Sequence, residues 1–363
     1  MKIAAAVSRE GSACPRIEDV ELDAPRPDEV RVRIVATGIC HTDLLCHAGR
    51  GVPTPRPIVL GHEGAGIVEQ VGAGVQGLVA GDPVVLSGAS CGLCPSCRAA
   101  RPTYCRETLR LSFGGMRADG SSPLSQKGAR LNGAFFAQSS FATHAVVPER
   151  SAVKVPADLP LHLLGPLGCG FITGAGAVFE AFRLRPGQSI VIFGAGSVGL
   201  AAVMAARIAG ASRIVAVDTL SGRLDLARAL GATECLLSGA STVAELREVE
   251  RHGFDYSFNT TSVPGVYSMA IECLSNEGTA GFVTRPVGEW SLNVAALLAG
   301  GRKFQGILGG SANPQLAIPQ LLGYWRQGRF PFERLITEFA FDDIAMAWEA
   351  CKSGAVIKPV LRM

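Results

Sequence analysis

SIVIFGAGSVGLAAVMAARIAG, residues 189–210, decides the fold of the second half of the chain. A β-branched run leads into a glycine turn and then into an alanine-rich run, which is the order of a buried strand, a tight loop and a helix. Residues 189–206 carry no charge and approach the minimum length of a membrane span, but their glycines favour the strand, loop and helix. We therefore expect an α/β domain here and no membrane segment.

The glycine turn, GAGSVG at 194–199, fits the dinucleotide-binding pattern G-x-G-x-x-G. Gly194 would make the tight turn, Gly196 would let a pyrophosphate approach the helix N-terminus, and Gly199 would let the helix pack closely on the strand. Asp218 ends the next expected strand, where a carboxylate accepts hydrogen bonds from a ribose and repels a 2′-phosphate. This predicts NAD rather than NADP. The alternative is an ordinary glycine turn, with Asp218 as a helix cap.

Strand and helix patterns alternate from about residue 170 to about residue 305. This alternation predicts a doubly wound parallel sheet with helices on both faces. The first 150 residues instead contain short alternating apolar runs, such as VRVRIVATG at 30–38, separated by turn signals, and predict a mainly β domain. A chain of 363 residues is long enough for two domains. We expect helices near 317–328 and 342–354 and a last strand within 355–363.

The composition excludes several classes of protein. The net charge of +3, with no basic block, gives no reason to expect a nucleic-acid partner or an anionic membrane surface. The first residues, MKIAAAVSREG, lack a secretory pattern and predict a strand in a cytoplasmic protein. In that compartment the 11 cysteines would remain reduced.

Four cysteines share one short segment, CGLCPSCRAARPTYC at 91–105. The spacing C-x2-C-x2-C-x7-C, with no other ligand nearby, predicts a closed tetrahedral structural zinc site. An iron–sulfur cluster is the alternative, disfavoured by the x7 gap and by the absence of proline after the fourth cysteine. The predicted ligands are Cys91, Cys94, Cys97 and Cys105.

A second metal site is predicted from residues that lie far apart in the sequence. Cys40, His62 and Cys169 each stand beside glycines, and two thiolates with one imidazole leave a fourth position open, as in catalytic zinc sites. The alternative for His62 is a core histidine with satisfied hydrogen bonds. Phe135 and Phe136 are expected in the core rather than in a pocket.

Taken together, these motifs resemble the zinc-dependent medium-chain dehydrogenases of the alcohol dehydrogenase type, over essentially the whole chain. The resemblance rests on CHTD, GHEGAGIVEQVG, GDPVVLS, the four-cysteine segment, GCG, GAGSVGL and KPVL, which occur in the order of that family. Within the family, the stretches at 135–147, 165–178 and 327–344 look most similar to aryl (benzyl-type) alcohol dehydrogenases.

The resemblance implies a Rossmann domain for NAD at 171–305. It also implies a mainly β, GroES-like catalytic domain formed by residues 1–170 and 306–363, with its zinc lobe at about 88–112. Two zinc ions per chain are expected. The edge strand near 302–310 would extend the Rossmann sheet into a second copy, giving a homodimer or a homotetramer.

The same resemblance assigns roles at the predicted catalytic zinc. Cys40, His62 and Cys169 are the expected ligands, and Glu63 is a carboxylate that approaches the metal from behind. Asp43 would orient the imidazole of His62 through its other nitrogen. Thr42 matches the hydroxyl that accepts the alcohol proton and passes it towards the cofactor ribose.

Cofactor contacts also follow from the resemblance. Thr173, Val198 and Val283 match positions beside the nicotinamide, and His41 and Lys358 match basic positions near the pyrophosphate. The whole predicted cofactor-binding set is Gly194, Gly196, Ser197, Val198, Gly199, Asp218, Arg223, Thr173, His41, Val283 and Lys358.

Two positions depart from the family pattern. Leu45 stands where many relatives carry the histidine that ends the proton relay. Either water, His41 or His47 would take over, although His47 is expected in a surface loop, or the relay would be short. Arg285 replaces a small or apolar residue near the nicotinamide. A solvated arginine is the simpler interpretation, and contact with an anionic substituent of the substrate is the alternative.

The expected activity is reversible hydride transfer between an aromatic or allylic primary alcohol and its aldehyde, with zinc and NAD. One alternative is a sister enzyme that acts on a formaldehyde-thiol adduct, a terpenoid alcohol or a polyol. Another is a non-catalytic binding protein on the same fold.

Overall fold

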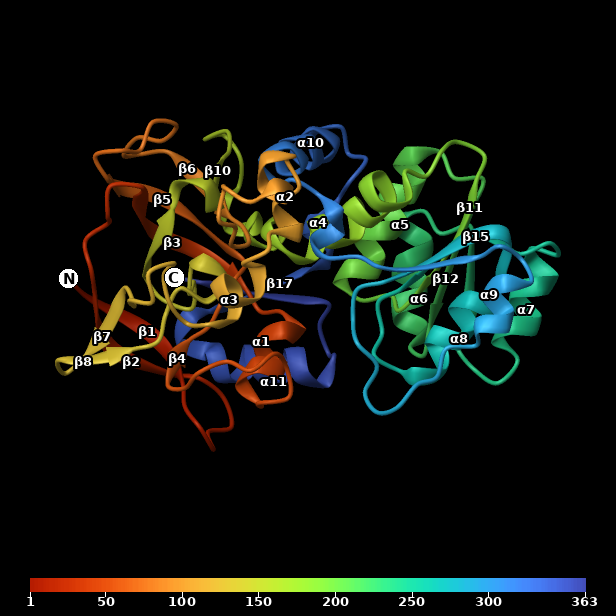
Figure 1. Ribbon diagram of the computed structural model, residues 1–363, viewed down its shortest axis with the longest axis horizontal. Helices are drawn as coiled ribbons and strands as arrows, with labels where there is room; N and C mark the ends of the chain where they lie inside the picture. The colour runs from red at the N-terminus through yellow and green to blue at the C-terminus, as the bar shows by residue number, and fades with distance from the viewer. The chain divides into compact units, whose positions relative to one another are not determined.

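The computed structural model describes residues 1–363, which divide into two units (Figure 1). The first unit consists of Met1–Cys169, Asn313–Pro319 and Glu333–Met363, and the second of Gly170–Ala312 and Gln320–Phe332.

The second unit contains the predicted doubly wound parallel sheet, and this fold class is confirmed. Its strands run in the spatial order β13 (Glu234–Leu237), β12 (Arg213–Asp218), β11 (Ser189–Phe193), β14 (Phe254–Asn259), β15 (Leu274–Phe282) and β16 (Lys303–Gly306). All five residues of β11 are buried, as expected for a central strand between two helical layers.

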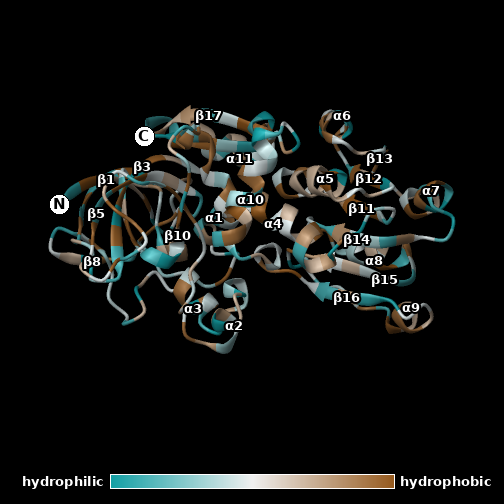
Figure 2. Cartoon of the chain, turned by 90° about the horizontal axis from the view of Figure 1, so that it is seen from above, coloured by the Kyte–Doolittle hydropathy of each residue, from teal (hydrophilic) through white to brown (hydrophobic).

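Helices cover both faces of this sheet. In sequence order they are α4 (Gly170–Gly176), a π-helical turn (Ala177–Phe182), α5 (Ser197–Ala209), α6 (Ser221–Leu230), α7 (Thr242–Val249), α8 (Pro264–Glu272) and α9 (Val294–Leu298). Figure 2 shows α5 and α6 on one side of the sheet and α8 and α9 on the other. Neither β13 nor α7 was predicted from the sequence, because β13 is short and half-exposed and lacks a clear apolar alternation.

The bounds of the units differ from the predicted domains near the C-terminus. All of 306–363 was expected in the first domain, whereas residues 306–312 and 320–332 belong to the second unit. The division falls within helix α10 (Pro314–Arg326), after Pro319. Aromatic packing explains the assignment, because the ring of Phe332 lies 5.5 Å from that of Phe171 in the second unit.

The first unit is built on two sheets. One has the order β4 (Ile58–Val59), β1 (Lys2–Ser8), β2 (Arg16–Leu22), β7 (Leu124–Gln126) and β8 (Ala129–Leu131). The other has the order β10 (Ala152–Lys154), β6 (Pro83–Leu86), β5 (Gly64–Val71), β3 (Glu29–Gly38), β18 (Lys358–Arg362) and β17 (Ile336–Ala340), and β9 (His144–Pro148) also pairs with β3. The long strand β3 thus joins β5, which follows His62 and Glu63, to β18, which begins at Lys358.

Short helices complete the first unit: α1 (His41–His47), α2 (Pro95–Arg98), α3 (Thr108–Phe113) and α11 (Ile344–Ser353). Helix α1 carries the CHTD motif and packs on α11, where the rings of His47 and Trp348 lie 5.1 Å apart. No helix of the chain has both the length and the apolar composition needed to cross a membrane.

The expectation that His47 lies in a surface loop is wrong. His47 is only 7% exposed and occupies the last turn of α1. Its Nδ1 lies 2.7 Å from the hydroxyl of Ser8, and its Nε2 lies 2.8 Å from the carbonyl oxygen of Ser12. Since a carbonyl only accepts, Nε2 carries the proton and the Ser8 hydroxyl donates to Nδ1.

A buried ion pair fixes the connection between α3 and β7. The guanidinium of Arg117 donates to both carboxylate oxygens of Glu29, at 2.8 and 3.1 Å, and to Asp23 at 2.8 Å. The side chains of Arg117 and Glu29 are 7% and 6% exposed. This network ties the connection to the start of β3.

Replacing Arg117 by methionine should lower the free energy of unfolding of the first unit by about 3 to 5 kcal/mol, because Glu29 would keep a buried charge without its partner. The matched control is Arg110→Met. Arg110 forms an ion pair with Glu107, and their side chains are 44% and 45% exposed. That control should change stability by less than about 1 kcal/mol. Urea titration measures both, and equal effects of the two replacements would contradict the assignment.

Burial lowers the pKa of His47 below its ordinary value, although its hydrogen bond to the Ser12 carbonyl acts in the opposite direction. The unfolded chain then binds more protons than the folded chain between the two pKa values, so stability is lost as the pH falls through this range. We expect His47→Gln to lose less stability than the wild type between about pH 7.5 and about pH 5.5 in urea titrations. The exposed control, His252→Gln, should behave as the wild type does. An unchanged pH dependence in His47→Gln would refute this prediction.

Candidate metal centres

Four side chains of the first unit converge on one point. The ligand atoms of Cys40, His62, Glu63 and Cys169 all lie within 4.8 Å of one another. Cys40 is the N-cap of α1, His62 and Glu63 immediately precede β5, and Cys169 follows the 3-10 turn Gly165–Gly168. The structure therefore brings together the residues that the sequence analysis selected from three distant segments.

Asp43 fixes the imidazole of His62. Its Oδ1 lies 3.0 Å from His62 Nδ1 and also accepts the backbone N–H of Gly61, while its Oδ2 accepts the backbone N–H of Cys40. A fully buried carboxylate at this distance favours the tautomer protonated at Nδ1, which leaves Nε2 with a free lone pair.

His62 Nε2 is buried and has no hydrogen-bond partner. A buried polar atom without a partner is costly, and a core histidine would normally satisfy both nitrogens. The orphaned nitrogen, together with the thiols of Cys40 and Cys169, fits the two-sulfur, one-nitrogen donor set of a catalytic zinc ion. The alternative of a satisfied core histidine is therefore inconsistent with the geometry.

Glycine is required in the segment that presents His62. Gly61 has φ of +90°, and a Cβ at this position would lie 2.4 Å from the backbone nitrogen of Phe141. Both the backbone conformation and the close approach exclude a larger residue.

Glu63 forms a buried ion pair with Lys358. Lys358 Nζ donates to both carboxylate oxygens, at 3.0 and 2.9 Å, and lies 3.3 Å from the carbonyl oxygen of Ile39. Burial acts to lower the pKa of Lys358, but the negative charge of Glu63 outweighs it and keeps that pKa above its ordinary value. Lys358 was predicted near a pyrophosphate; in the structure it is 2% exposed and its nearest partner is Glu63.

The charges around Cys40 favour its thiolate. The hydrogen bond from the Cys169 thiol lowers the pKa of Cys40 well below its ordinary value against the effect of burial, and the positive charge of Lys358 acts in the same direction. A thiolate is the form in which cysteine binds a metal.

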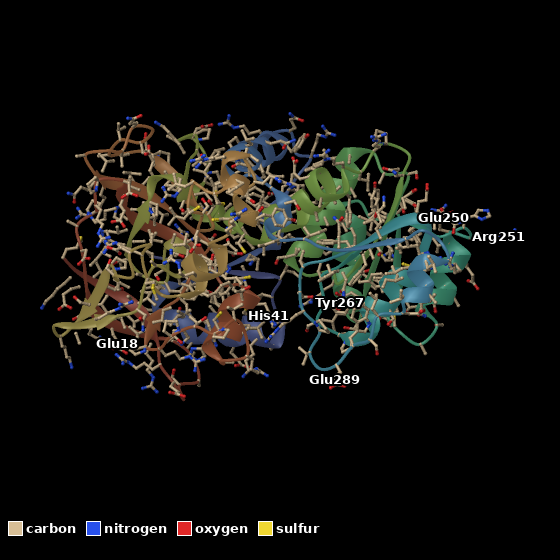
Figure 3. All side chains as sticks on the ribbon, viewed as in Figure 1. Glu18, His41, Glu250, Arg251, Tyr267 and Glu289 are labelled. Atoms are coloured by element: carbon tan, nitrogen blue, oxygen red, sulfur yellow. The ribbon has the colours of Figure 1, made fainter.

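The expected proton relay is partly resolved. The Thr42 hydroxyl lies 3.9 Å from Cys40 Sγ, beside the metal position, and Leu45 on the same helix is half-buried. His47 cannot take the place of the missing relay histidine, because both of its ring nitrogens already have protein partners. His41, labelled in Figure 3, is exposed at the start of α1. Water, His41 and a short relay remain as predictions.

The role of the turn that contains Phe135, Phe136 and Gln138 was not predicted from the sequence. Phe135 is fully buried, as expected, but Phe136 is only half-buried and stacks on the His62 ring at 4.6 Å. Gln138 is 2% exposed and bonds to the backbone on both sides of Glu63. Two adjacent aromatic residues before a buried polar run were the only signal in the sequence.

The four-cysteine lobe forms a second convergent set. The sulfur atoms of Cys91, Cys94, Cys97 and Cys105 also lie within 4.8 Å of one another. Backbone N–H groups point at them, including that of Cys94 at 3.3 Å from Cys91 Sγ. Such hydrogen bonds, chiefly from the backbone of Arg106, lower the pKa of Cys94 to about 6. The four sulfur donors match a closed tetrahedral zinc site.

In the second unit, the glycine turn joins β11 to α5 as the pattern requires. A Cβ on Gly199 would lie 1.8 Å from the carbonyl oxygen of Gly194, so the helix packs closely on the turn. A Cβ on Gly196 would meet no protein atom within 4 Å, so this glycine is not required for packing and leaves space at the N-terminus of α5. The carboxylate of Asp218 accepts the backbone N–H groups of Ala195 and Leu220, at 2.6 and 2.9 Å.

Five further predicted cofactor residues lie in the second unit and are half-buried: Thr173, Ser197, Val198, Arg223 and Val283. Arg285, just beyond the end of β15, is exposed. This exposure is what the solvated interpretation predicts, and contact with the substrate stays a prediction.

Comparison with known proteins places both units in one family. The model of the alcohol dehydrogenase GroES-like domain matches residues 26–157, and that of the zinc-binding dehydrogenase domain matches residues 197–323. A geraniol dehydrogenase of Castellaniella defragrans is 45% identical over 362 residues, which cover 98% of this chain and 96% of the relative.

Two solved structures are similar along the whole chain. The alcohol dehydrogenase zinc-binding domain protein of Burkholderia ambifaria is 47% identical with a TM-score of 0.96, and benzyl alcohol dehydrogenase of Acinetobacter calcoaceticus is 40% identical with a TM-score of 0.96. Each comparison covers 100% of this chain and 99% of the other.

Replacing Asp43 by asparagine should weaken zinc binding at the His62 site by about 10- to 100-fold, because the imidazole would lose the charged acceptor that orients it. Zinc content after dialysis against a graded chelator measures the change. Asp342→Asn, an exposed substitution in the same unit, is the control and should retain its zinc. Equal retention in the two variants would argue against an orienting role for Asp43.

Proposed function

This chain belongs to the zinc-dependent medium-chain alcohol dehydrogenases, and from this premise we propose that it interconverts aromatic or allylic primary alcohols and their aldehydes with NAD. The observation that carries the proposal is the convergence of Cys40, His62 and Cys169 around the unpartnered Nε2 of His62. We further propose that these three residues hold a catalytic zinc ion, with Glu63 behind it, and that the four-cysteine lobe holds a second, structural zinc ion.

A zinc ion at this site supplies Lewis acidity, which lowers the pKa of a bound alcohol. The protein residues prepare the site for it. Asp43 holds the imidazole of His62 with Nε2 exposed to the ion, and the fixed charges around Cys40 favour its thiolate. The pair of Glu63 and Lys358 adds a carboxylate and an ammonium whose charges compensate each other, so the site gains no net charge from them.

Thr42 is the proposed proton acceptor. Its hydroxyl is both donor and acceptor, so it can take a proton from the substrate hydroxyl as it passes its own proton on. Its position 3.9 Å from Cys40 Sγ supports this role. Leu45, next on the helix face, offers no proton acceptor and His47 is engaged, so water and His41 are the proposed acceptors of the proton that Thr42 passes on.

The proposed cofactor site follows from the second unit. The dinucleotide phosphates would lie at the N-terminus of α5, where the backbone N–H groups of Ser197 and Val198 belong to the first helical turn. The Asp218 carboxylate already accepts two backbone N–H groups, and each oxygen retains a lone pair for a ribose hydroxyl. Its negative charge supports NAD over NADP.

The proposed substrate class rests on the named relatives. Geraniol and benzyl alcohol both carry the hydroxyl on a carbon next to a double bond or an aromatic ring, and the proteins with these names are 45% and 40% identical to this chain. An allylic or benzylic primary alcohol is their shared chemistry.

We propose a homodimer or homotetramer that includes the edge of the Rossmann sheet. Strand β16 pairs only with β15, so its outer edge offers backbone donors and acceptors to a second copy of the chain.

Initial rates with NAD should separate the substrate classes. We expect kcat/KM for benzyl, cinnamyl and geranyl alcohols to exceed that for ethanol by at least about tenfold, since an apolar group gains binding energy that ethanol lacks. A preference for short aliphatic alcohols, or turnover of a formaldehyde-thiol adduct or a polyol alone, would overturn the assignment. Two bound zinc ions without turnover of any alcohol would support a binding protein.

Cofactor choice is tested at Asp218. Asp218→Asn keeps an oxygen for a backbone N–H but removes the charge that repels a 2′-phosphate. The ratio of kcat/KM for NADP to that for NAD should rise by about tenfold or more, which corresponds to about 1.4 kcal/mol. Asp225→Asn, 75% exposed in α6, is the control and should leave the ratio unchanged. A ratio that stays constant in Asp218→Asn would remove the charge argument.

A further inference from the structure

The turn from Ala134 to Ser140 has an unusual backbone. Four of its residues that are not glycine have positive φ: Ala134 (52°), Phe136 (51°), Ala137 (60°) and Ser139 (55°). The left-handed conformation costs an L-residue about 1 to 2 kcal/mol, so a series of four persists only where the surroundings strongly favour it. The contacts of this turn explain its shape.

The turn lies along the segment that ends in His62. The backbone N–H groups of Ser140 and Phe141 donate to the carbonyl oxygens of Gly61 (3.0 Å) and Leu60 (3.1 Å). The hydroxyl of Ser139 donates to the carbonyl oxygen of Val59 at 2.6 Å. The backbone of residues 59–61 is thus held over its whole length.

Gln138 continues this contact through its side chain. Its Nε2 donates to the carbonyl oxygen of His62 at 2.9 Å, and its Oε1 accepts the backbone N–H of Gly64 at 3.1 Å. Nε2 also lies 3.4 Å from the carbonyl oxygen of Ser87. Because His62 offers an acceptor and Gly64 a donor, the two partners determine the orientation of the carboxamide. One buried side chain therefore bridges the peptide groups on both sides of Glu63.

The rings of this turn enclose the imidazole. Phe136 stacks on the His62 ring with centroids 4.6 Å apart and planes at 25°, and Phe135 meets it edge-on at 5.6 Å and 77°. Asp43 holds its Nδ1. The direction of Nε2 therefore depends on three supports: a carboxylate on the ring, two aromatic rings beside it, and a carboxamide on its backbone.

The backbone support is needed because glycines flank the His-Glu pair. Gly61 and Gly64 have little intrinsic preference for one conformation, so the peptide groups of His62 and Glu63 are not fixed by local sterics. Strand β3 holds one group of this backbone, since the N–H of Gly38 donates to the carbonyl oxygen of Glu63 at 3.0 Å. Gln138 holds the carbonyl oxygen of His62 and the N–H of Gly64.

We infer that Gln138 is a positioning residue for the catalytic metal: it touches neither the ion nor the substrate, but fixes the backbone from which His62 and Glu63 reach the site. This inference deepens the proposed function and rests on it only for the identity of the ion.

The main test is the rate at which the holoenzyme releases zinc to a chromogenic chelator. In Gln138→Met, which has the same length without hydrogen-bonding groups, one of the two zinc ions should leave about 10- to 100-fold faster than in the wild type, the range found when groups behind a metal ligand are lost. The other zinc ion should leave at the wild-type rate. The matched control is Asn132→Leu, which removes a carboxamide that donates to the Pro57 carbonyl in the same unit. It should leave both rates unchanged.

Cobalt(II) loaded at the same site gives a second measurement, its visible spectrum. The spectrum reports the arrangement of the metal ligands and does not change when the fold is only less stable. The visible spectrum should change in Gln138→Met and stay unchanged in Asn132→Leu. If Gln138→Met does not fold, Gln138→Glu serves instead: it keeps an acceptor for Gly64 and loses the donor to the carbonyl oxygens of His62 and Ser87, so faster zinc release and a changed spectrum are again expected.

A wild-type release rate and cobalt spectrum in the Gln138 variants would overturn the inference, as would equal acceleration in Asn132→Leu. Neither readout requires a substrate, so its result is independent of the alcohol assay. Faster release without turnover of any alcohol would support the positioning role while rejecting the proposed activity, and turnover with an unchanged release rate would do the reverse.

Discussion

The hydrogen bond between Asp43 and His62 is the interaction on which the first unit depends. It selects the tautomer of a buried imidazole and leaves Nε2 without a protein partner. An unsatisfied nitrogen in the core is costly unless a ligand compensates for it. The thiols of Cys40 and Cys169 lie beside this nitrogen, so the three groups together form a donor set for a metal ion. The same carboxylate bonds to the backbone of Cys40 and Gly61, so one residue connects helix α1 to the segment before β5.

The residues around this hydrogen bond fix the positions and balance the charges of the metal-binding side chains. Lys358 on the last strand balances the charge of Glu63, and the left-handed turn that contains Gln138 holds the backbone of the glycine-flanked pair. Residues separated by almost the whole chain length are therefore needed to present one nitrogen atom. This arrangement explains why the first unit recruits the C-terminal strand β18 beside β3.

The parts of this account that were predictable from sequence are those with local signals. The glycine turn at 194–199, the alternation of strands and helices around it, and the four cysteines at 91–105 each specify their structure within a few residues, and the fold class followed from them. Cys40, His62 and Cys169 carry only weak local signals, and their selection depended on a resemblance to a family. The structure then brought them together.

Other features could not be predicted because they depend on tertiary contacts. The burial of His47 follows from its partners Ser8 and Ser12, which belong to another part of the first unit. The division of α10 between the two units falls directly after Pro319 and reflects aromatic packing of residues 320–332. The role of Gln138 depends on a turn with several positive φ angles, which places its carboxamide against the His62 backbone. Alanine, phenylalanine and serine rarely adopt positive φ, so this conformation could not be predicted from the sequence.

Anomalous X-ray scattering on either side of the zinc absorption edge tests the central claim most directly. The account predicts one zinc peak within bonding distance of Cys40 Sγ, His62 Nε2 and Cys169 Sγ, and a second among the four cysteines of the lobe. Crystals of active protein with a peak only in the lobe, or with His62 Nε2 turned towards a protein acceptor, would contradict it.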